Sequence, residues 1–318
     1  MEPQTPSPAP APGRSRITAP LSGLPDLTGR TAVVTGGAGG LGLATARGLA
    51  RKGADVLLGV RDTERGEQAR RRLIEQDHVR PQQVTIAQLD LLDLASVHRF
   101  AAEAARRPLD ILVLNAGISS VPLRLSRQGV ESQFATNHLG HFALAGRLLD
   151  VLGQGTDPRV VTVSSALYKG GVLDVDDLAG AHGYSPGRAY SRSKLANTMF
   201  AVELGHRLAE SDSPVRSFAA HPGMARTPLH TTYPSAVTRV ATAVAARVIG
   251  RDPGPAAVAV LTAAASAQVD PRLFWGPAGS HTRPDALGVP FAAVATDRSA
   301  ARRLWSASVR LTGVDPWG

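Results

Sequence analysis

Short apolar runs alternate along this chain with longer segments in which apolar residues recur every three or four positions. Short runs bounded by glycine or polar residues are typical of buried strands, whereas the three-to-four spacing is typical of helices. The predicted strands span residues 31–35, 54–60, 84–89, 110–114, 159–164 and 215–219. The predicted helices span residues 41–51, 63–77, 94–107, 126–152 and 188–211.

Strands that alternate with helices of this length form a parallel sheet joined by right-handed crossovers. The sequence therefore predicts an α/β fold, a doubly wound parallel sheet of the Rossmann type with helices on both faces. Local signals agree with this fold, because Asp62 or Thr63, and later Asp93, stand where the N-caps of two helices are expected.

The first 28 residues differ in composition from the rest of the chain. Proline occupies seven of these positions, with serine, threonine and alanine between them. Such a segment buries too little apolar surface to fold, so we predict a disordered tail over residues 1–28. A single Rossmann-type domain is predicted over residues 29–318.

The sequence shows neither a secretory signal nor a membrane-spanning segment. The tail contains no continuous apolar stretch of the kind found in signal peptides. The uncharged segment from Gly254 to Val269 is too short to span a bilayer, and we interpret it as a buried helix. We therefore expect a cytoplasmic protein without a membrane span.

Composition narrows the classes of function. The chain of 318 residues is 43% hydrophobic, which is enough for a sizeable core. It has no cysteine, so disulfides and thiolate metal sites are excluded. The formal net charge is +9, but arginine clusters such as Arg70 to Arg72 are scattered over predicted helices. We interpret the excess as a compositional bias and do not expect nucleic-acid binding.

A glycine-rich turn connects the first predicted strand with the first helix. Residues 35–42 read Thr-Gly-Gly-Ala-Gly-Gly-Leu-Gly. Glycine is required where the backbone adopts a positive φ or approaches a phosphate closely. The helix that follows presents free N–H groups to a pyrophosphate. In this strand–turn–helix context the turn predicts a dinucleotide site.

The end of the second strand indicates which nicotinamide cofactor binds. Enzymes that use NAD usually place an acidic residue there, against the ribose 2′-hydroxyl. Here the strand ends at Val60 and Arg61 follows, while Asp62 is expected to cap the next helix. Since arginine pairs with a 2′-phosphate, we predict NADP, with NAD the less favoured choice.

Tyr190 and Lys194 lie four residues apart in a predicted helix and therefore share a face. A tyrosine has an ordinary pKa of about 10, and a nearby cation lowers it by favouring the phenolate. A shift of ~2–3 units requires roughly 3–4 kcal/mol. The pair would then act as a general acid/base near physiological pH. By itself, the same spacing also fits an ordinary solvated helix face.

Taken together, the glycine turn and the Tyr190/Lys194 pair resemble those of the short-chain dehydrogenase/reductase family. The chain is most similar to the branch of retinol dehydrogenases, WW-domain oxidoreductases and protochlorophyllide reductases. Further motifs occur in the family's order from about residue 28 to the C-terminus. They are Val60-Arg61-Asp62, Leu89-Asp90-Leu91, Leu114-Asn115-Ala116-Gly117, Asn137-His138-Leu139-Gly140-His141-Phe142, Val163-Ser164-Ser165, Leu195-Ala196-Asn197, His221-Pro222-Gly223 and Arg303-Leu304-Trp305.

The resemblance implies the strand order 3-2-1-4-5-6-7 and a role for each matched residue. Tyr190 is the implied acid/base, and Lys194 binds the nicotinamide ribose and tunes the tyrosine. Ser165 is implied to hydrogen-bond the substrate oxygen, and Asn137 to hold a water in a proton relay. The implied cofactor-binding positions are Gly36, Gly40, Leu41, Gly42, Arg61, Asp90, Asn115, Ala116, Gly117, Tyr190, Lys194, Pro222 and Gly223.

We therefore expect an NADP-dependent oxidoreductase that transfers a hydride between nicotinamide and an apolar ketone, aldehyde or alcohol. The mostly apolar segment 224–250 is the expected substrate lid. The helices over 126–152 and 188–211 are candidate surfaces for a homodimer.

Other interpretations stay open at this point. The same fold also serves as a catalytically silent NADP(H)-binding sensor or scaffold, although Asn137, Ser165, Tyr190 and Lys194 are all present. A Ser/Tyr/Lys hydrolase is more remote, because the glycine turn indicates a nucleotide. We expect no metal, since His138 and His141 lack an evident third ligand.

Overall fold

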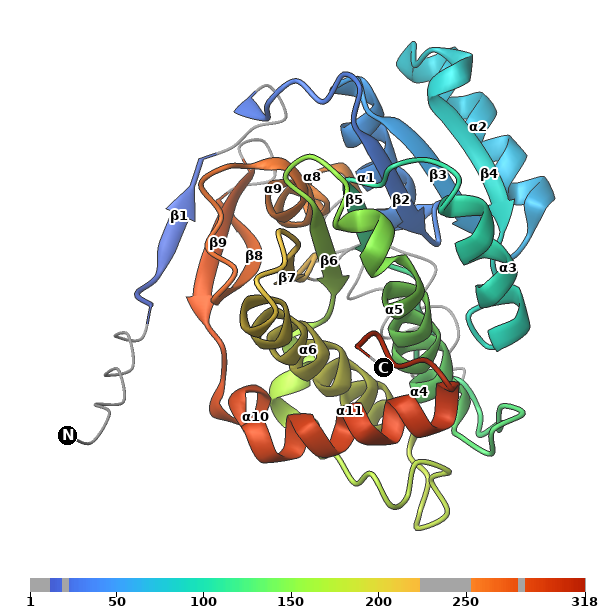
Figure 1. Ribbon diagram of the computed structural model, residues 1–318, viewed down its shortest axis with the longest axis vertical. Coiled ribbons are helices and arrows are strands. Elements are labelled where there is room, and N and C mark those ends of the chain that lie inside the picture. The colour runs from blue at the N-terminus through green and yellow to red at the C-terminus, as the bar shows by residue number, and fades with distance from the viewer. Residues whose placement is uncertain (1–11, 19–22, 224–252, 280–283, 318) are drawn as a thin grey trace.

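The computed structural model describes residues 12–18, 23–223, 253–279 and 284–317. A nine-stranded sheet lies at its centre, in the order β1-β9-β8-β7-β6-β5-β2-β3-β4 (Figure 1). The strands are β1 (Ser15–Ile17), β2 (Thr31–Thr35), β3 (Asp55–Val60), β4 (Val84–Gln88), β5 (Ile111–Leu114), β6 (Arg159–Val163), β7 (Arg216–Ala220), β8 (Leu273–Gly279) and β9 (Pro284–Pro290).

The strands from β4 to β8 are parallel and confirm the predicted order and the α/β fold. Every residue of β5 and β6 is buried. Helices cover both faces of a doubly wound sheet, so its central strands read as continuous apolar runs instead of alternating ones. This burial is why short hydrophobic segments were sufficient to locate them.

Helices pack on the two faces of the sheet (Figure 1). One face is covered by α1 (Gly40–Arg51), α2 (Thr63–Asp77), α8 (Pro253–Ala256) and α9 (Val258–Ala265). The other is covered by α3 (Leu94–Ala104), α5 (Gly140–Leu152) and α6 (Pro186–Glu210). Asp62 and Asp93 accept backbone N–H groups at the starts of α2 and α3, which confirms both predicted N-caps.

The prediction of a disordered tail over residues 1–28 is wrong for part of that segment. Residues 15–17 form β1, which pairs antiparallel with β9 and buries Ile17. Leu24 and Leu27 are also buried in the core beside α1. An edge strand of three residues is stabilised by its partner, so its own sequence gives little signal.

Two further predictions concern the later part of the chain. The uncharged segment from Gly254 to Val269 contains a buried helix, which is divided at Ala257 into α8 and α9. The expected lid over residues 224–250 lies outside the described residues. None of the helices in the described part of the chain has the length and apolar character needed to cross a membrane.

The long helix predicted over residues 126–152 is interrupted. The chain forms α4 (Ser132–Phe134), a π-helical turn (Ala135–Leu139) and then α5. In this turn the N–H of Gly140 bonds the carbonyl of Ala135, five residues back. Single π turns are rare and often mark functional sites. This one contains Asn137.

The C-terminal helix α11 (Arg298–Thr312) lies across α5 and α6 (Figure 1). Its Trp305 is buried, with its ring 4.9 Å from that of Phe142 and 5.9 Å from that of Phe200. The guanidinium of Arg207 lies 4.4 Å from the same ring. The apolar surfaces of α5 and α6, which the sequence offered for a homodimer, are thus covered to this extent by the chain itself.

We predict that Trp305→Ala lowers the free energy of unfolding by about 3–5 kcal/mol, because it removes a large buried ring from this layer. Urea denaturation followed by circular dichroism measures the change. Trp317→Ala is the comparison variant: its ring lies 5.5 Å from that of Trp305 but is 39% exposed, so it should cost less than Trp305→Ala. Equal losses for the two variants would show that α11 is not anchored through Trp305.

Candidate active site

The residues predicted to bind cofactor and substrate follow the carboxyl ends of neighbouring strands. The glycine turn follows β2, Asn115 follows β5, and Ser164 follows β6. These strands are parallel neighbours, so their carboxyl ends meet at one edge of the sheet. A ligand that lies along this edge contacts all three connections.

The glycine turn has the close geometry that its sequence predicts. Gly36 and Gly40 have φ values of 69° and 54°, in the left-handed region that favours glycine. A Cβ at Gly42 would lie 2.4 Å from the carbonyl oxygen of Gly36, so only glycine fits there. The side chain of Asn115 donates to the carbonyl of Thr35 at 2.7 Å and supports the turn from below.

The start of helix α1 fits a pyrophosphate group. Gly39 occupies the N-cap position and has no side chain that accepts the first N–H groups of the helix. A Cβ at Gly39 would meet no atom within 4 Å, so the space over the helix start is open. Unpaired N–H groups at a helix start attract an anion. Gly36, Gly40, Leu41 and Gly42 therefore fit the role of holding the dinucleotide phosphates.

Arg61 and Asp90 follow β3 and β4, the strands that continue the sheet beyond β2. The N–H of Gly36 bonds the carbonyl of Gly59 at 2.8 Å, and Arg61 follows two residues later with an exposed side chain. Asp90 is half-buried beyond β4, and its carboxylate accepts the N–H of Leu92 at 2.9 Å. Asp90 therefore shapes a turn.

Lys194 is the buried cation of the site. Its side chain is 4% exposed, and its ammonium donates to the carbonyl of Val163 at 3.1 Å. Burial lowers the pKa of Lys194 from 10.5 to about 8. The nitrogen lies 5.7 Å from the centre of the Tyr190 ring, one helical turn earlier. The predicted pair is therefore brought together on one face of α6.

Asn137 is held from three directions. Its Oδ1 accepts the N–H of Ile118 at 2.8 Å, and its Nδ2 donates to the carbonyl of the same residue at 2.9 Å. The Nδ2 also donates to the hydroxyl of Ser193 at 2.9 Å, and Ser193 donates to the carbonyl of Tyr190. A Cβ added to Gly117 would lie 3.1 Å from the Oδ1 of Asn137 and 3.7 Å from the Nζ of Lys194, so Asn137 and Lys194 border the same spot.

The two serines after β6 have different roles. Ser164 is buried and donates to the carbonyl of Lys194 at 2.9 Å, which ties the strand to α6. Ser165 is half-buried, and its oxygen accepts the N–H of Leu167 at 3.3 Å. That contact uses the serine as an acceptor, so the hydroxyl hydrogen of Ser165 is available for another acceptor.

Pro222 and Gly223 end the described segment after β7. Gly223 has a φ of 69°, and its N–H donates to Nδ1 of His221 at 3.1 Å. Around the site and elsewhere in the part of the chain that the structure describes, histidine and acidic side chains do not gather in threes as a metal ion requires.

A family model described as short chain dehydrogenase matches residues 30–237, from the first parallel strand to beyond Gly223. The chain belongs to the short-chain dehydrogenase/reductase family. It is thereby a nicotinamide-dependent oxidoreductase by family, with the fold and the cofactor turn described above.

Two relatives place this short-chain dehydrogenase in the retinol dehydrogenase-like branch. Mouse polyprenol dehydrogenase is 36% identical over 91% of this chain and 86% of its own length. Human retinol dehydrogenase 14 is 41% identical, and that alignment spans 63% of each chain.

Two solved structures share the fold. An uncharacterised protein of Mycobacterium paratuberculosis is 40% identical, covers 93% of this chain and 97% of its own, and superposes with a TM-score of 0.75. The second is a Beutenbergia cavernae protein assigned as an NAD(P)-dependent gluconate 5-dehydrogenase, whose crystal structure has NADP bound. It is 26% identical, covers 76% of this chain and 92% of its own, and superposes with a TM-score of 0.60.

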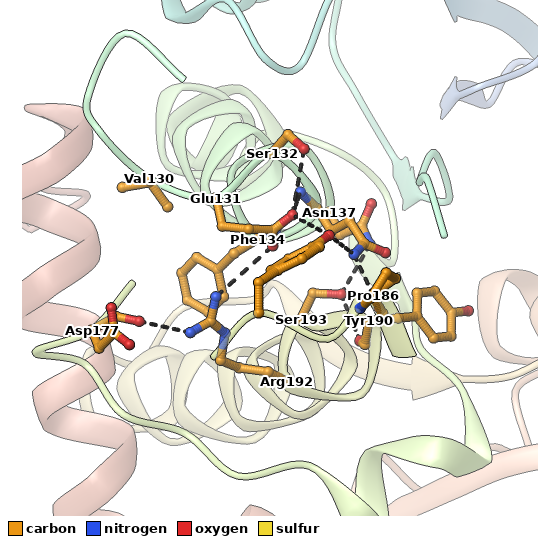
Figure 2. Close-up of polar contacts among 12 residues, drawn as sticks. Val130, Glu131, Ser132, Phe134, Asn137, Asp177, Pro186, Tyr190, Arg192 and Ser193 are labelled. Atoms are coloured by element: carbon orange, nitrogen blue, oxygen red, sulfur yellow. Dashed lines mark hydrogen bonds and ion pairs between the residues drawn. The ribbon is translucent and has the colours of Figure 1, made fainter. Parts of the chain in front are cut away.

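A polar cluster beside the site of this short-chain dehydrogenase was not predicted from the sequence. Figure 2 shows Arg192 reaching between Glu131 and Asp177, while the Tyr190 side chain extends to the other side. The Arg192 guanidinium lies 3.9 Å from the fully buried carboxylate of Glu131 and donates to the carbonyl of Asp177 at 2.7 Å. The cluster ties α4 and the loop before α6 to α6 itself.

The sequence contained a partial signal for this cluster. Arg192 and Ser193 stand between Tyr190 and Lys194, so their side chains project from other sides of the same helix. Glu131 accepts the N–H groups of Gln133 and Phe134 at the start of α4, as a cap does. The sequence does not show that Glu131, which caps α4, also forms an ion pair with Arg192 of α6.

Lys194 generates a prediction about stability and pH. Because the folded-state pKa is depressed to about 8, the ammonium opposes folding fully below pH 8, and this cost disappears as the pH rises towards 10.5. We predict that Lys194→Met stabilises the protein without cofactor by about 1–3 kcal/mol at pH 7, and by less at pH 9.5.

Urea denaturation of both proteins at the two pH values measures this gap. Lys169→Met is the control, since Lys169 is exposed and its removal should leave the gap near zero at both values. A Lys194→Met variant that is less stable than the wild type at pH 7 would contradict the buried charge.

Proposed function

We propose that this protein is an NADP-dependent oxidoreductase that transfers a hydride between nicotinamide and an apolar ketone, aldehyde or alcohol. Tyr190 is its acid/base. The observation that carries the proposal is the position of a buried Lys194 ammonium one helical turn from Tyr190 and against the end of β6. Family membership and the open cofactor turn support it.

The residues divide the work as follows. A nicotinamide bound along the strand ends supplies or accepts the hydride. The ammonium of Lys194 favours the phenolate form of Tyr190, so the phenol exchanges a proton more readily near neutral pH. Tyr190 and Ser165 donate hydrogen bonds to the substrate oxygen and stabilise the negative charge that develops there during reduction. Asn137 is fixed beside Lys194 and supports the path that returns the proton.

The preference for NADP rests on Arg61. The carbonyl of Gly59 accepts the N–H of Gly36 in the glycine turn. Arg61 follows Gly59 by two residues and is exposed, at the position where an acidic residue would favour NAD. A guanidinium there forms charge-assisted hydrogen bonds with a 2′-phosphate. The related structure with bound NADP supports the same choice.

An apolar substrate is supported by the surface near the site. Of the five exposed large hydrophobic side chains in the described residues, four lie in the connections that follow β5 and β6, the strands that lead to Asn115 and Ser165. They are Leu123, Leu125, Leu167 and Val172. Exposed apolar side chains gathered near a site favour an apolar partner. The two curated relatives are named for polyprenol and retinol, both long apolar alcohols.

We predict that Tyr190→Phe lowers kcat by about 10²–10⁴-fold while the Kd for NADPH changes little, because only the proton donor is lost. A panel of apolar and small charged carbonyls and alcohols, assayed with NADPH and NADP⁺, provides the measurement. Tyr168→Phe is the matched control, since the Tyr168 hydroxyl instead accepts the N–H of Ala292 and its loss should leave kcat unchanged.

Two outcomes of this panel would count against the proposal. Turnover confined to small charged substrates would contradict the apolar class. Tight NADPH binding with no turnover of any substrate would favour a cofactor sensor.

We predict separately that Arg61→Ala raises the Kd for NADPH by roughly 10-fold or more and leaves the Kd for NADH unchanged, because one charge-assisted contact is removed. Fluorescence titration of both cofactors measures it. Arg72→Ala removes the same charge from an exposed position in α2 and serves as the control. A wild-type protein that binds NADH more tightly than NADPH would refute the assignment.

A further inference from the structure

His141 is a buried titratable residue that the mechanism above does not use. It lies in α5, one helical turn after Asn137, and is 2% exposed. Each of its ring nitrogens has one partner at 2.9 Å. The Nδ1 faces the backbone carbonyl of Asn137, and the Nε2 faces the hydroxyl of Thr35.

The partners of Thr35 decide where the protons of this ring are. The hydroxyl oxygen of Thr35 already accepts the backbone N–H groups of Asn115 and Ala116, both at 2.9 Å. A hydroxyl has two acceptor positions and one hydrogen, so Thr35 can only donate to a third partner. Of the two oxygen or nitrogen atoms left to receive it, Nε2 of His141 is nearer than the carbonyl of Val113, which lies at 3.4 Å.

It follows that Nε2 of His141 carries no hydrogen. The single proton of a neutral imidazole is then on Nδ1, from which it is donated to the carbonyl of Asn137. A doubly protonated ring would aim a second N–H at an oxygen with no acceptor position left. Burial is the main reason why the pKa of His141 falls from 6.5 to about 4; the hydrogen bond to the carbonyl of Asn137 opposes this shift, and the nearby Lys194 charge adds to it. The electrostatics therefore agree with the hydrogen-bond count.

The two partners belong to the two halves of the site. Thr35 is the last residue of β2, and the glycine turn for the cofactor begins immediately after it. Asn137 lies in the π-helical turn, with its side chain fixed by Ile118 and Ser193. The imidazole is a rigid ring, so it sets the distance between the carbonyl of Asn137 and the end of β2.

We propose that His141, as the neutral tautomer with its proton on Nδ1, is a positioning residue that fixes the Asn137 peptide relative to the cofactor turn. This inference rests on the proposed function for its catalytic consequence. Its structural content, the tautomer and the link to the cofactor turn, stands independently and is testable without turnover.

The first test reads the tautomer directly. Long-range ¹H–¹⁵N correlation spectra of the full-length protein with labelled histidine identify which ring nitrogen carries the proton. At pH 7 we expect His141 to be neutral with the proton on Nδ1, and we expect saturating NADP⁺ to shift its resonances. Protonation at Nε2, or resonances that NADP⁺ does not move, would overturn the proposal even if no substrate is known.

The second test separates positioning from cofactor binding. His141→Phe keeps a ring of similar shape and removes both hydrogen bonds, so kcat should fall roughly 10- to 100-fold while the Kd for NADPH changes by less than about threefold. In His141→Asn the Nδ2 lies as many bonds from the backbone as Nδ1 of histidine. It restores the donor to Asn137, and kcat should recover by about tenfold relative to the phenylalanine variant.

His138, in the π-helical turn just before His141, provides a control for the general effect of removing a buried histidine. His138 is 1% exposed and bonds Ser308 of α11 at 2.9 Å, so it contacts neither Asn137's carbonyl nor Thr35 in the described contacts. His138→Phe should leave kcat within about threefold of the wild type. A folded His141→Phe with unchanged kcat, or an asparagine variant no better than phenylalanine, would overturn the positioning role.

These outcomes differ from a failure of the proposed function. If Tyr190→Phe retains full activity, the acid/base assignment is wrong, whereas the tautomer and the response to NADP⁺ still decide the link through His141. If His141→Phe is not folded, the spectra of the wild type and the kinetics of His141→Asn carry the decision.

Discussion

A positive charge kept out of water is the constraint on which this site depends. The ammonium of Lys194 is almost fully buried and has one backbone carbonyl, that of Val163, as a hydrogen-bond acceptor. Burial of a charge is unfavourable unless it is compensated, and the lowered pKa records that cost. The rest of the fold supplies the stability that holds it there, since β6 lies at the centre of a sheet covered on both faces. The charge is therefore available to act on Tyr190.

Rigidity around this charge comes from polar links between elements that are distant in sequence. Ser193 of α6 accepts a hydrogen bond from Asn137, and the ion pair between Glu131 and Arg192 links α4 to the same helix (Figure 2). Asn137 itself lies in a π-helical turn, where the wider backbone spacing turns its side chain towards Ile118. Glu131, Asn137 and Ser193 are buried and hydrogen-bonded, which in a low-dielectric interior favours one arrangement over its alternatives, whereas the Nε of Arg192 has no partner among the described contacts. The site is thus built as a network of fixed parts before any cofactor or substrate binds.

Much of the fold was readable because its signals are local. The buried strand β5 appears as an uninterrupted apolar run, and Asp62 and Asp93 indicate the starts of the helices that they cap. The edge strand β1 and the interruption of the helix at residues 135–139 were missed. The strand depends on β9, near the other end of the chain, and the side chain of Asn137 in the turn is held by Ile118, 19 residues earlier; neither contact has a periodic pattern in the sequence.

The sequence by itself determined the parallel strands, the cofactor turn and the Tyr190/Lys194 pair, because strand burial, glycine backbone geometry and residue chemistry are local properties. The strand order and the roles of the other site residues came from the resemblance of its motifs to the short-chain dehydrogenase/reductase family. Only the tertiary structure decided how these residues are held. The burial of Lys194, the tautomer of His141 and the pairing of Glu131 with Arg192 depend on which atoms from other elements fill the space around each group. Hydrogen-bond counts and desolvation are properties of that three-dimensional neighbourhood.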